Sequence, residues 1–286
     1  MHLSFILALV CGASAFAGEI RILDWNIDKG KRFDDIARTI RAFQPDLCFL
    51  QEVDANARRT RNVSVTDDLA GELGYRSFFA PAYQELAQRV GEEPAWLGQG
   101  LLTRLPVRNT RILHFEAQSS FWQPRPWLPN WPVLQRRLGG RVAQVVEIET
   151  LDGLVVVYNL HLESRSVSAR MGQVEETLAD ARKYPRDVPV VIAGDLNTHF
   201  HQGKYGERFK TEGFESCFGD EHPKTQRLGR VDWIFVRGPA KCTDAAVHHG
   251  TPGSDHYPIT VKLMIERNRS AHGRPTGVMP LPVPLR

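Results

Sequence analysis

Short apolar runs and two amphipathic stripes alternate along most of the chain. Residues Ile20–Trp25 alternate between apolar and polar positions, and Leu47–Leu50, Leu154–Leu160 and Val188–Ala193 are mainly apolar runs. Runs of this length are typical of strands that are buried on both faces of a sheet. Apolar residues spaced three and four apart predict helices over 33–43 and 167–181. With late strands expected over 231–236 and 258–265, the pattern predicts a layered α/β domain whose helices cover the faces of sheets.

The two ends of the chain depart from this alternation. An uncharged apolar run, Leu3–Val10, leads to Ala15-Phe16-Ala17, and this combination predicts a signal peptide over residues 1–17. The alternative is an uncleaved anchor, but the run is shorter than the roughly 20 apolar residues that a membrane span needs. Residues 267–286 are rich in Arg, Gly and Pro, and we expect a disordered tail there. We therefore expect an exported protein, periplasmic or extracellular, with one domain over 18–266.

The composition adds little beyond this. The chain is 42% hydrophobic and 24% charged, as ordinary soluble proteins are, and its formal net charge is +3. This mild positive charge permits an anionic partner, but the cations are scattered rather than gathered into a stripe. We expect a monomer, and neither the charge nor the absence of repeats assigns a partner.

The cysteines leave one question open. Cys48 lies within an apolar run and is expected to be an inert core residue. Cys217 and Cys242 flank a predicted strand, so they could form a disulfide in an oxidising compartment. Two free thiols are an equally good interpretation, because the sequence does not give the separation between the two residues.

Polar residues suited to metal or phosphate chemistry stand where the predicted strands end. They are Asn26, Glu52, His161, Asp195 with Asn197, Asp232 in a fifth strand, and Asp255 with His256 in the turn before the last strand. Groups at the carboxyl ends of neighbouring strands converge on one crevice in α/β sheets. We therefore expect these residues, which are far apart in the sequence, to meet in space.

Each of these residues alone has an ordinary structural interpretation. Asn26 could cap a turn, Asp195 and Asn197 could form a local Asx-turn, and His161 could be a satisfied core histidine. A carboxylate such as Glu52 at a strand end could simply be solvated. The occurrence of all of them at strand ends or in the following turns favours a catalytic site.

Taken together, the motifs resemble the endonuclease/exonuclease/phosphatase superfamily, which includes DNase I-like nucleases and phosphatases. The resemblance rests on six segments in the expected order over nearly the whole of residues 18–266: Trp25-Asn26, Gln51-Glu52, His161, Gly194-Asp195-Leu196-Asn197, Asp232 and Ser254-Asp255-His256. It implies a four-layer α/β/β/α sandwich with two packed mixed β-sheets. It also implies divalent-metal-dependent hydrolysis of a phosphoester by attack of water on phosphorus.

The resemblance assigns the metal to three of these residues. Glu52 is the expected first ligand, and Asn26 and Asp255 complete or orient the site. Oxygen ligands of this kind suit Mg²⁺, with Mn²⁺ as a substitute. The chain has no Cys/His cluster with zinc spacing, so we do not expect a structural zinc.

The remaining residues receive catalytic roles by the same resemblance. His161 and His256 are expected to donate hydrogen bonds to the phosphate, and Asp232 to hold and charge His256. Asp195 is expected to orient or deprotonate the attacking water, with Asn197 beside it as a donor to a phosphoryl oxygen. The sequence does not say which group is the general base.

The substrate is left open. We favour a lipid, inositol or small-molecule phosphoester, with a secreted DNase I-like nuclease as the alternative, so nucleic acid is a second candidate partner. A further alternative is a non-catalytic binding protein on the same fold. The Trp- and Pro-rich segment 121–131 could cover the domain, contact a membrane surface or stack bases. Arg165 and Arg170 could reach a substrate phosphate or could be surface cations at a helix start.

Overall fold

The computed structural model describes most of the chain between the two ends. The described residues are 16–88, 93–119, 121, 129, 134, 137–198, 202–219, 221, 223–227 and 229–266. The predicted signal peptide up to residue 15, the predicted tail 267–286 and most of segment 121–131 lie outside them. Within the described ranges, none of the helices combines the length and the apolar character that crossing a membrane requires.

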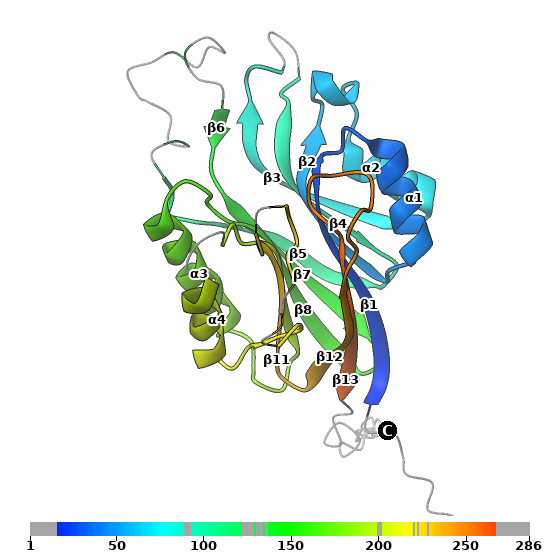
Figure 1. Cartoon of the computed structure of the whole chain (residues 1–286), viewed down its shortest axis with the longest axis vertical. Helices are drawn as coiled ribbons and strands as arrows, with labels where there is room; N and C mark the ends of the chain where they lie inside the picture. Colours follow the sequence, from blue (N-terminus) through cyan, green and yellow to red (C-terminus); the bar gives the residue numbers. More distant parts are fainter. Residues whose placement is uncertain are drawn as a thin grey trace, which may run out of the picture.

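Two β-sheets form the centre of the domain (Figure 1). The seven-stranded sheet has the order β12 (Ala240–Val247), β13 (Ile259–Glu266), β1 (Phe16–Lys29), β2 (Leu47–Ala55), β4 (Trp96–Thr103), β3 (Arg76–Glu85) and β6 (Arg137–Gly139). The six-stranded sheet has the order β10 (Glu215–Ser216), β11 (Asp232–Arg237), β9 (Val190–Asp195), β8 (Gly153–His161), β7 (Val142–Thr150) and β5 (Val107–His114). The pairs β1–β2 and β8–β9 are parallel and the other neighbouring strands are antiparallel, so both sheets are mixed.

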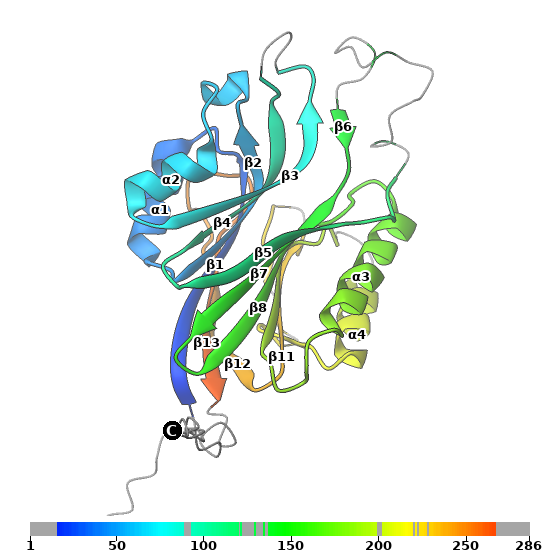
Figure 2. The same ribbon diagram turned by 180° about the vertical axis from the view of Figure 1, so that it is seen from behind.

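Helices cover the outer face of each sheet, as Figure 1 and the reverse view in Figure 2 show. Helices α1 (Phe33–Phe43) and α2 (Val65–Leu73), with the short 3₁₀ helix η1 (Arg58–Thr60) between them, lie beside the seven-stranded sheet. Helices α3 (Val167–Ala181) and α4 (Gln202–Thr211) lie beside the six-stranded sheet. The predicted α/β/β/α sandwich of two packed mixed sheets is confirmed, and so are the two helices predicted from their apolar stripes.

The period of two along the strands divides the core into layers. On β1, Ile20 and Ile22 face the opposite sheet, whereas Leu23 and Trp25 face α1. The same alternation on the other central strands builds an apolar layer between the sheets and one under each pair of helices. The inward-facing positions of the strands therefore decide what occupies the space between the sheets.

The boundary predicted at Ala17 remains a prediction. Strand β1 begins at Phe16, which pairs with Glu266 of β13, so pairing in the sheet starts two residues before the expected first residue of the mature chain. Nothing in the arrangement of the strands tests whether the preceding segment is removed.

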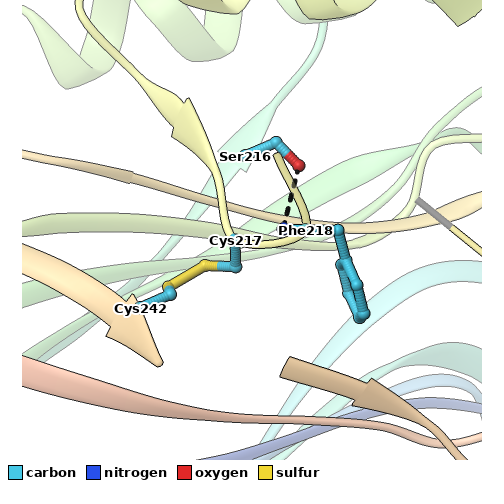
Figure 3. The surroundings of a disulfide bond; sticks show 4 residues. All are labelled: Ser216, Cys217, Phe218 and Cys242. Atoms are coloured by element: carbon cyan, nitrogen blue, oxygen red, sulfur yellow. Dashed lines mark hydrogen bonds between the residues drawn. A yellow bond between two sulfur atoms is a disulfide. The ribbon is translucent and has the colours of Figure 1, made fainter. Parts of the chain in front are cut away.

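A disulfide joins the two sheets at one edge (Figure 3). Cys217 follows β10 and Cys242 lies on β12, and their Cα atoms are 5.1 Å apart. This pairing resolves the alternative that the sequence left open. Cys48 is a free, buried thiol, in agreement with its expected place in the core.

Candidate active site

Polar side chains replace apolar ones at one end of the layer between the sheets. On β8, Val155 and Val157 belong to the apolar layer, and the next inward positions are Asn159 and His161. On β1, Ile20 and Ile22 are followed inward by Asp24 and Asn26. The same change brings Asp195 inward at the end of β9, Asp232 at the start of β11 and Gln51 on β2. Because the period of two is kept throughout, five strands present polar groups to one place between the sheets.

Three of the predicted residues form a single row across the six-stranded sheet. His161 pairs with Asp195 across the parallel β8–β9 ladder, and Asp195 pairs with Asp232 across the antiparallel β9–β11 ladder. Asp232 therefore reaches the row from the beginning of its strand rather than the end. The expectation that distant polar residues converge is fulfilled for these three by the register of the strands.

Asp195 lies at the centre of the cluster. Its carboxylate accepts hydrogen bonds from Asn26 Nδ2 at 3.1 Å and from the backbone N–H of Asn197 at 2.9 Å. The Nε2 atoms of His161 and His256 lie 3.6 and 3.9 Å from Asp195 Oδ2. Since Asn26 belongs to the other sheet, Asp195 connects the two sheets at this end.

Asn197 occupies an unusual backbone conformation beside Asp195. Its φ of +52° lies in the left-handed region, which asparagine adopts more readily than most residues. Its Nδ2 donates to the carbonyl of Leu162 at 3.0 Å, so one amide hydrogen is engaged with the loop after β8. The hydrogen bond from the backbone N–H of Asn197 to Asp195 Oδ1 is the local Asx-type contact that the sequence allowed, and it places Asn197 next to the cluster.

His256 and Asp232 form a buried pair. Both oxygens of the Asp232 carboxylate lie within 3.0 Å of His256 Nδ1, and both side chains are almost fully buried. Burial opposes protonation of His256, but the charges of Asp232, Asp195 and Asp255 raise its pKa to about 10. His256 is therefore an imidazolium at neutral pH, in the orientation that Asp232 imposes, as the resemblance implied.

The other histidine of the cluster, His161, is neutral rather than charged. Burial and the positive charge of Arg141 together lower the pKa of His161 to about 3, so the ring is neutral at pH 7. The site thus combines one charged and one neutral imidazole within reach of the same carboxylate. A charged ring can donate a strong hydrogen bond to an anion, and a neutral ring can also accept one.

Glu52 stands at the rim of the cluster on β2. Its carboxylate forms an ion pair with the ammonium group of Lys29 and lies 4.0 Å from His161 Nε2. Burial opposes ionisation of Glu52, but the positive charges of Lys29 and Arg141 lower its pKa below the usual value. Glu52 also has a φ of +50°, and β2 continues beyond it to Ala55, so Glu52 does not end its strand as the apolar pattern suggested.

Asp255, the third predicted metal ligand, lies in the turn before β13 and contacts Gln226. Its side chain is exposed and accepts a hydrogen bond from Gln226 Nε2 at 3.4 Å. Among the described residues, no hydrogen bond or ion pair joins Asp255 to Glu52 or Asn26. Gln226 also lies 3.1 Å from His256 Nε2, which makes it a neighbour of the site that no strand-end motif indicated.

Arg141 is a second residue that the sequence patterns did not single out. It is 5% exposed, and its positive charge lowers the pKa of both Glu52 and His161. It lies in the short connection between β6 and the start of β7, where neither strand-end polarity nor helical spacing marks it. An arginine beside a phosphate site is a suitable anion ligand.

The remaining cationic candidates divide into two groups. Arg170 is buried and donates to Tyr205 and to the carbonyl oxygens of Glu163 and Ser164, so it holds the loop after β8. Arg165 is exposed, with its guanidinium carbon 4.1 Å from the centroid of the Phe121 ring. Arg170 is therefore a structural residue, whereas Arg165 remains at the surface.

The donor set fits a divalent cation with hard oxygen ligands. The Glu52 carboxylate is partly exposed and is the expected first ligand. Asp195, Asp232 and His256 also bring one possible ligand atom each within 4.8 Å of one another, but the bond between His256 and Asp232 engages two of these three side chains. The ammonium group of Lys29 on Glu52 and Asp28 shows that these carboxylates attract a cation. Carboxylate and amide oxygens are ligands that Mg²⁺ accepts while keeping several waters.

Fold and site together define an α/β sandwich with a buried cluster of carboxylates, amides and imidazoles at one end of its central layer. The family model of the endonuclease/exonuclease/phosphatase family matches residues 25–256, and the chain belongs to this family. Members of this family are phosphoester hydrolases of the nuclease and phosphatase type that commonly use divalent metals. A search of curated protein sequences finds no match to the chain.

Solved structures of the same fold are similar over most of the chain. The catalytic domain of human Nocturnin with a bound sulfate anion is 18% identical, with a TM-score of 0.67 over 86% of this chain and 94% of that domain. An endonuclease/exonuclease/phosphatase from Beutenbergia cavernae is 18% identical, with a TM-score of 0.65 over 87% of this chain and 72% of its own. Truncated Caenorhabditis elegans TDP2 is 19% identical, with a TM-score of 0.59 over 88% and 100%. At these identities the comparison establishes the fold.

Proposed function

We propose that the chain is an exported, divalent-metal-dependent hydrolase in which water attacks the phosphorus of a phosphoester. The observation that carries this proposal is the row His161–Asp195–Asp232, with His256 bonded to Asp232 and Asn26 bonded to Asp195 from the opposite sheet. Burying several charged groups together is costly unless they are paired, so their gathering at one place supports a functional role.

In this proposal, Glu52 is the first ligand of Mg²⁺, or of Mn²⁺ in its place, and Asn26 and Asp255 complete or orient the site. The bound ion would neutralise charge on the phosphoryl oxygens. Lys29 holds the Glu52 carboxylate when no other cation is near and would move aside from it. Asp255 is exposed and would contact the ion through water, which Mg²⁺ commonly keeps.

The other residues bind the phosphate and direct the water. His256, charged and held by Asp232, donates a hydrogen bond to a phosphoryl or leaving-group oxygen. His161 donates a second, and Asn197 contributes its remaining amide hydrogen. Asp195 accepts a proton or a hydrogen bond from the attacking water, because its carboxylate lies at the centre of these donors.

For the substrate we favour a lipid, inositol or small-molecule phosphoester. A cleft of about 570 Å³ lies between the start of α1 and η1, and its lining begins at Gly30, the residue after Lys29 in the chain. Three of the five basic residues that line it form ion pairs: Lys31 with Asp28, Arg38 with Asp35, and Arg59 with Asp54. A nucleic-acid strand needs several cations that are available to neutralise phosphates, so this cleft favours a compact substrate.

A secreted nuclease is the second candidate, and one observation favours it. Phe121 is 40% exposed, and the guanidinium groups of Arg165 and Arg137 lie 4.1 and 5.3 Å from the centroid of its ring. An exposed aromatic ring between arginines is suited to stacking a base beside a phosphate. Contact of segment 121–131 with a membrane surface is a proposal that rests on the sequence alone, because most of that segment lies outside the described residues.

The test is turnover on a panel of phosphoesters. Purified protein is assayed with bis(p-nitrophenyl) phosphate, duplex and single-stranded DNA, and sphingomyelin or phosphoinositide vesicles, each with Mg²⁺, Mn²⁺ or chelator. Metal-dependent cleavage that His256→Ala abolishes is expected, with the vesicles or the small ester preferred over DNA. Preferred cleavage of DNA that weakens steeply with salt would replace the first candidate with the second. Absence of turnover on the whole panel would favour a non-catalytic binding protein on the same fold.

Export has its own support and its own test. The Cys217–Cys242 disulfide fits an oxidising compartment such as the periplasm or the exterior. Expression of the full chain with cell fractionation and N-terminal sequencing is expected to give a periplasmic or secreted protein that begins at Gly18. A cytoplasmic protein that keeps Met1 would contradict this part of the proposal.

A further inference from the structure

Glu52 lies in a β-bulge. In the ladder between β2 and β4, Leu50 pairs with Gly100 and Val53 pairs with Gly98, so Gln51 and Glu52 together oppose the single residue Gln99. The ladder between β1 and β2 is shifted at the same place, between its Asn26 and Lys29 pairs. Bulges change the direction of a side chain, and this one turns Glu52 toward His161.

The bulge carries backbone strain. Glu52 has a φ of +50°, a conformation that glutamate rarely adopts. A strained conformation persists only where the surroundings hold it. The residues that hold Glu52 therefore decide where its carboxylate lies.

Asn159 holds the bulge from the opposite sheet. It is 1% exposed and lies on β8, and its Nδ2 donates to the carbonyl of Leu50 at 3.2 Å and to the carbonyl of Gly100 at 2.9 Å. Leu50 and Gly100 are the last regular pair before the bulge. One amide group from the six-stranded sheet thus bonds both strands of the seven-stranded sheet where their ladder is interrupted.

The side chain of Gln51 connects the bulge to two further residues. Its Nε2 donates to Asn159 Oδ1 and to Asp24 Oδ1, each at 2.8 Å, and all three side chains are buried. Asp24, Gln51 and Asn159 therefore form a chain of hydrogen bonds across the layer between the sheets. This chain lies directly beneath the site, because Asp24 precedes Asn26 and Asn159 precedes His161 on the same inward faces of their strands.

We propose that Asn159 is a positioning residue that fixes the Gln51–Glu52 bulge and so aims the Glu52 carboxylate at the metal, with Asp24 supporting it through Gln51. This inference rests on the proposed function, in which Glu52 is a metal ligand. Groups that orient a metal ligand typically change metal affinity by about 10- to 100-fold when they are removed. Asn159 acts through Glu52 and does not itself contact substrate.

The test is the affinity of the protein for Mn²⁺ alone, measured by EPR titration, together with turnover of bis(p-nitrophenyl) phosphate. The variants are Asn159→Leu and Gln51→Met, which remove the hydrogen bonds and keep the approximate volumes. We expect the Kd for Mn²⁺ to rise by about 10- to 100-fold in both, and excess Mn²⁺ to restore most of the kcat. Asp24→Asn keeps the acceptor for Gln51, so its Kd should stay within about 3-fold of the wild type.

Tyr158→Phe is the matched control. Tyr158 is the neighbour of Asn159 on β8 but faces α3, where its hydroxyl donates to Asp180 at 2.7 Å. This variant also loses one buried hydrogen bond and should bind Mn²⁺ as the wild type does. A rise in Kd for Tyr158→Phe equal to that for Asn159→Leu would overturn the proposal, because general destabilisation would then explain both.

The variant Glu52→Gln distinguishes the positioning role of Asn159 from the assignment of Glu52 as a metal ligand, on which that role rests. If Glu52→Gln weakens Mn²⁺ binding while folded Asn159→Leu and Gln51→Met bind normally, the positioning role is wrong and the ligand assignment stands. If Glu52→Gln leaves Mn²⁺ binding unchanged, the ligand assignment is wrong and the positioning proposal is overturned with it. Should Asn159→Leu fail to fold by circular dichroism, Gln51→Met decides the question by the same criteria.

Discussion

The two ends of the layer between the sheets are built from the same strands but differ in the polarity of their buried side chains. At the end marked by Ile20, Val155 and Ile265, inward positions are apolar and pack closely. At the other end, marked by Asn26, His161 and Asp195, the inward positions are polar and buried. The strands keep the same period of two up to Asn26, Gln51 and Asn159, so the difference lies in residue type and in the Gln51–Glu52 bulge just beyond them. One end therefore supplies stability, and the other carries the proposed chemistry at a cost in stability.

That cost is visible in atoms whose hydrogen bonding is incomplete. Asp24 Oδ2 and Gln51 Oε1, both buried near the polar end, have no hydrogen-bond partner among the described residues. Burial raises the pKa of Asp24 well above its ordinary value, and the charges of Asp232 and Asp195 raise it further. Buried polar atoms without partners destabilise a fold, so their presence here indicates that the polar end is kept for a purpose other than stability.

The largest effect is expected from a change at the polar end. Asp232→Asn keeps the shape of the side chain but removes the charge that holds His256 as an imidazolium. We expect kcat for bis(p-nitrophenyl) phosphate to fall by about 10²- to 10⁴-fold, the usual contribution of acid–base groups. The thermal midpoint should change by only a few degrees. A large loss of stability with near-normal activity would show that the pair is structural.

The converse change at the apolar end should affect stability alone. Leu263 is fully buried in the layer between the sheets, and Leu263→Ala removes its contacts there. The free energy of unfolding should fall by about 3 kcal/mol, as for other leucines in cores. Urea denaturation measures this loss, and kcat at a temperature where the variant is folded should equal that of the wild type. A matching loss of kcat would mean that the two ends are not independent.

The disulfide at the edge of the sheets should contribute a similar amount. Cys217 and Cys242 are separated by 25 residues, and closing a loop of that size stabilises a protein by about 3 kcal/mol through the unfolded state. The double variant Cys217→Ser/Cys242→Ser should lose that stability and keep its turnover. The comparison is made by denaturation of both proteins without reductant, and equal midpoints would show that the bond contributes nothing.

The smallest effect is expected at a buried carboxylate far from the site. Burial opposes ionisation of Asp180, but hydrogen bonds from Arg111, Lys183 and Tyr158 lower its pKa below the usual 3.8. A lowered pKa stabilises the fold at pH values above the unfolded pKa, and this contribution is lost as the pH falls through the folded pKa. Asp180→Asn should therefore lower the free energy of unfolding by about 1–2 kcal/mol at pH 7, a modest amount because the ion pair with exposed Lys183 is screened by solvent. The loss should be smaller below about pH 4. A loss that does not depend on pH would contradict this account.

Much of the fold could be predicted from the sequence because strands buried on both faces leave a clear apolar signal. The runs at 154–160 and 188–193 correspond to β8 and β9, and the apolar stripes correspond to α1 and α3. Strands such as β5 (Val107–His114) were not predicted. Three of its residues, Arg108, Asn109 and Thr110, are polar and exposed at the edge of a sheet, so it lacks that apolar signal.

The sequence indicates the residues of the candidate site but not their geometry. His161, Asp195 and Asp232 were found because each interrupts an apolar strand, and the register then brings them into one row. Arg141 and Gln226 were missed because they lie outside regular strands, where polar residues are ordinary. The bulge at Glu52 was also missed, since it depends on Asn159 from the opposite sheet and not on the local sequence.

The position of a bound metal ion tests the central claim most directly. Crystals grown with Mn²⁺ and measured at the manganese absorption edge would locate the ion by its anomalous scattering. The account predicts one peak at the Glu52 carboxylate, next to Asn26, with the Lys29 ammonium displaced and the His256–Asp232 pair intact. A peak bound by Asp232 and His256 in place of their mutual bond, or no peak at the polar end, would contradict it.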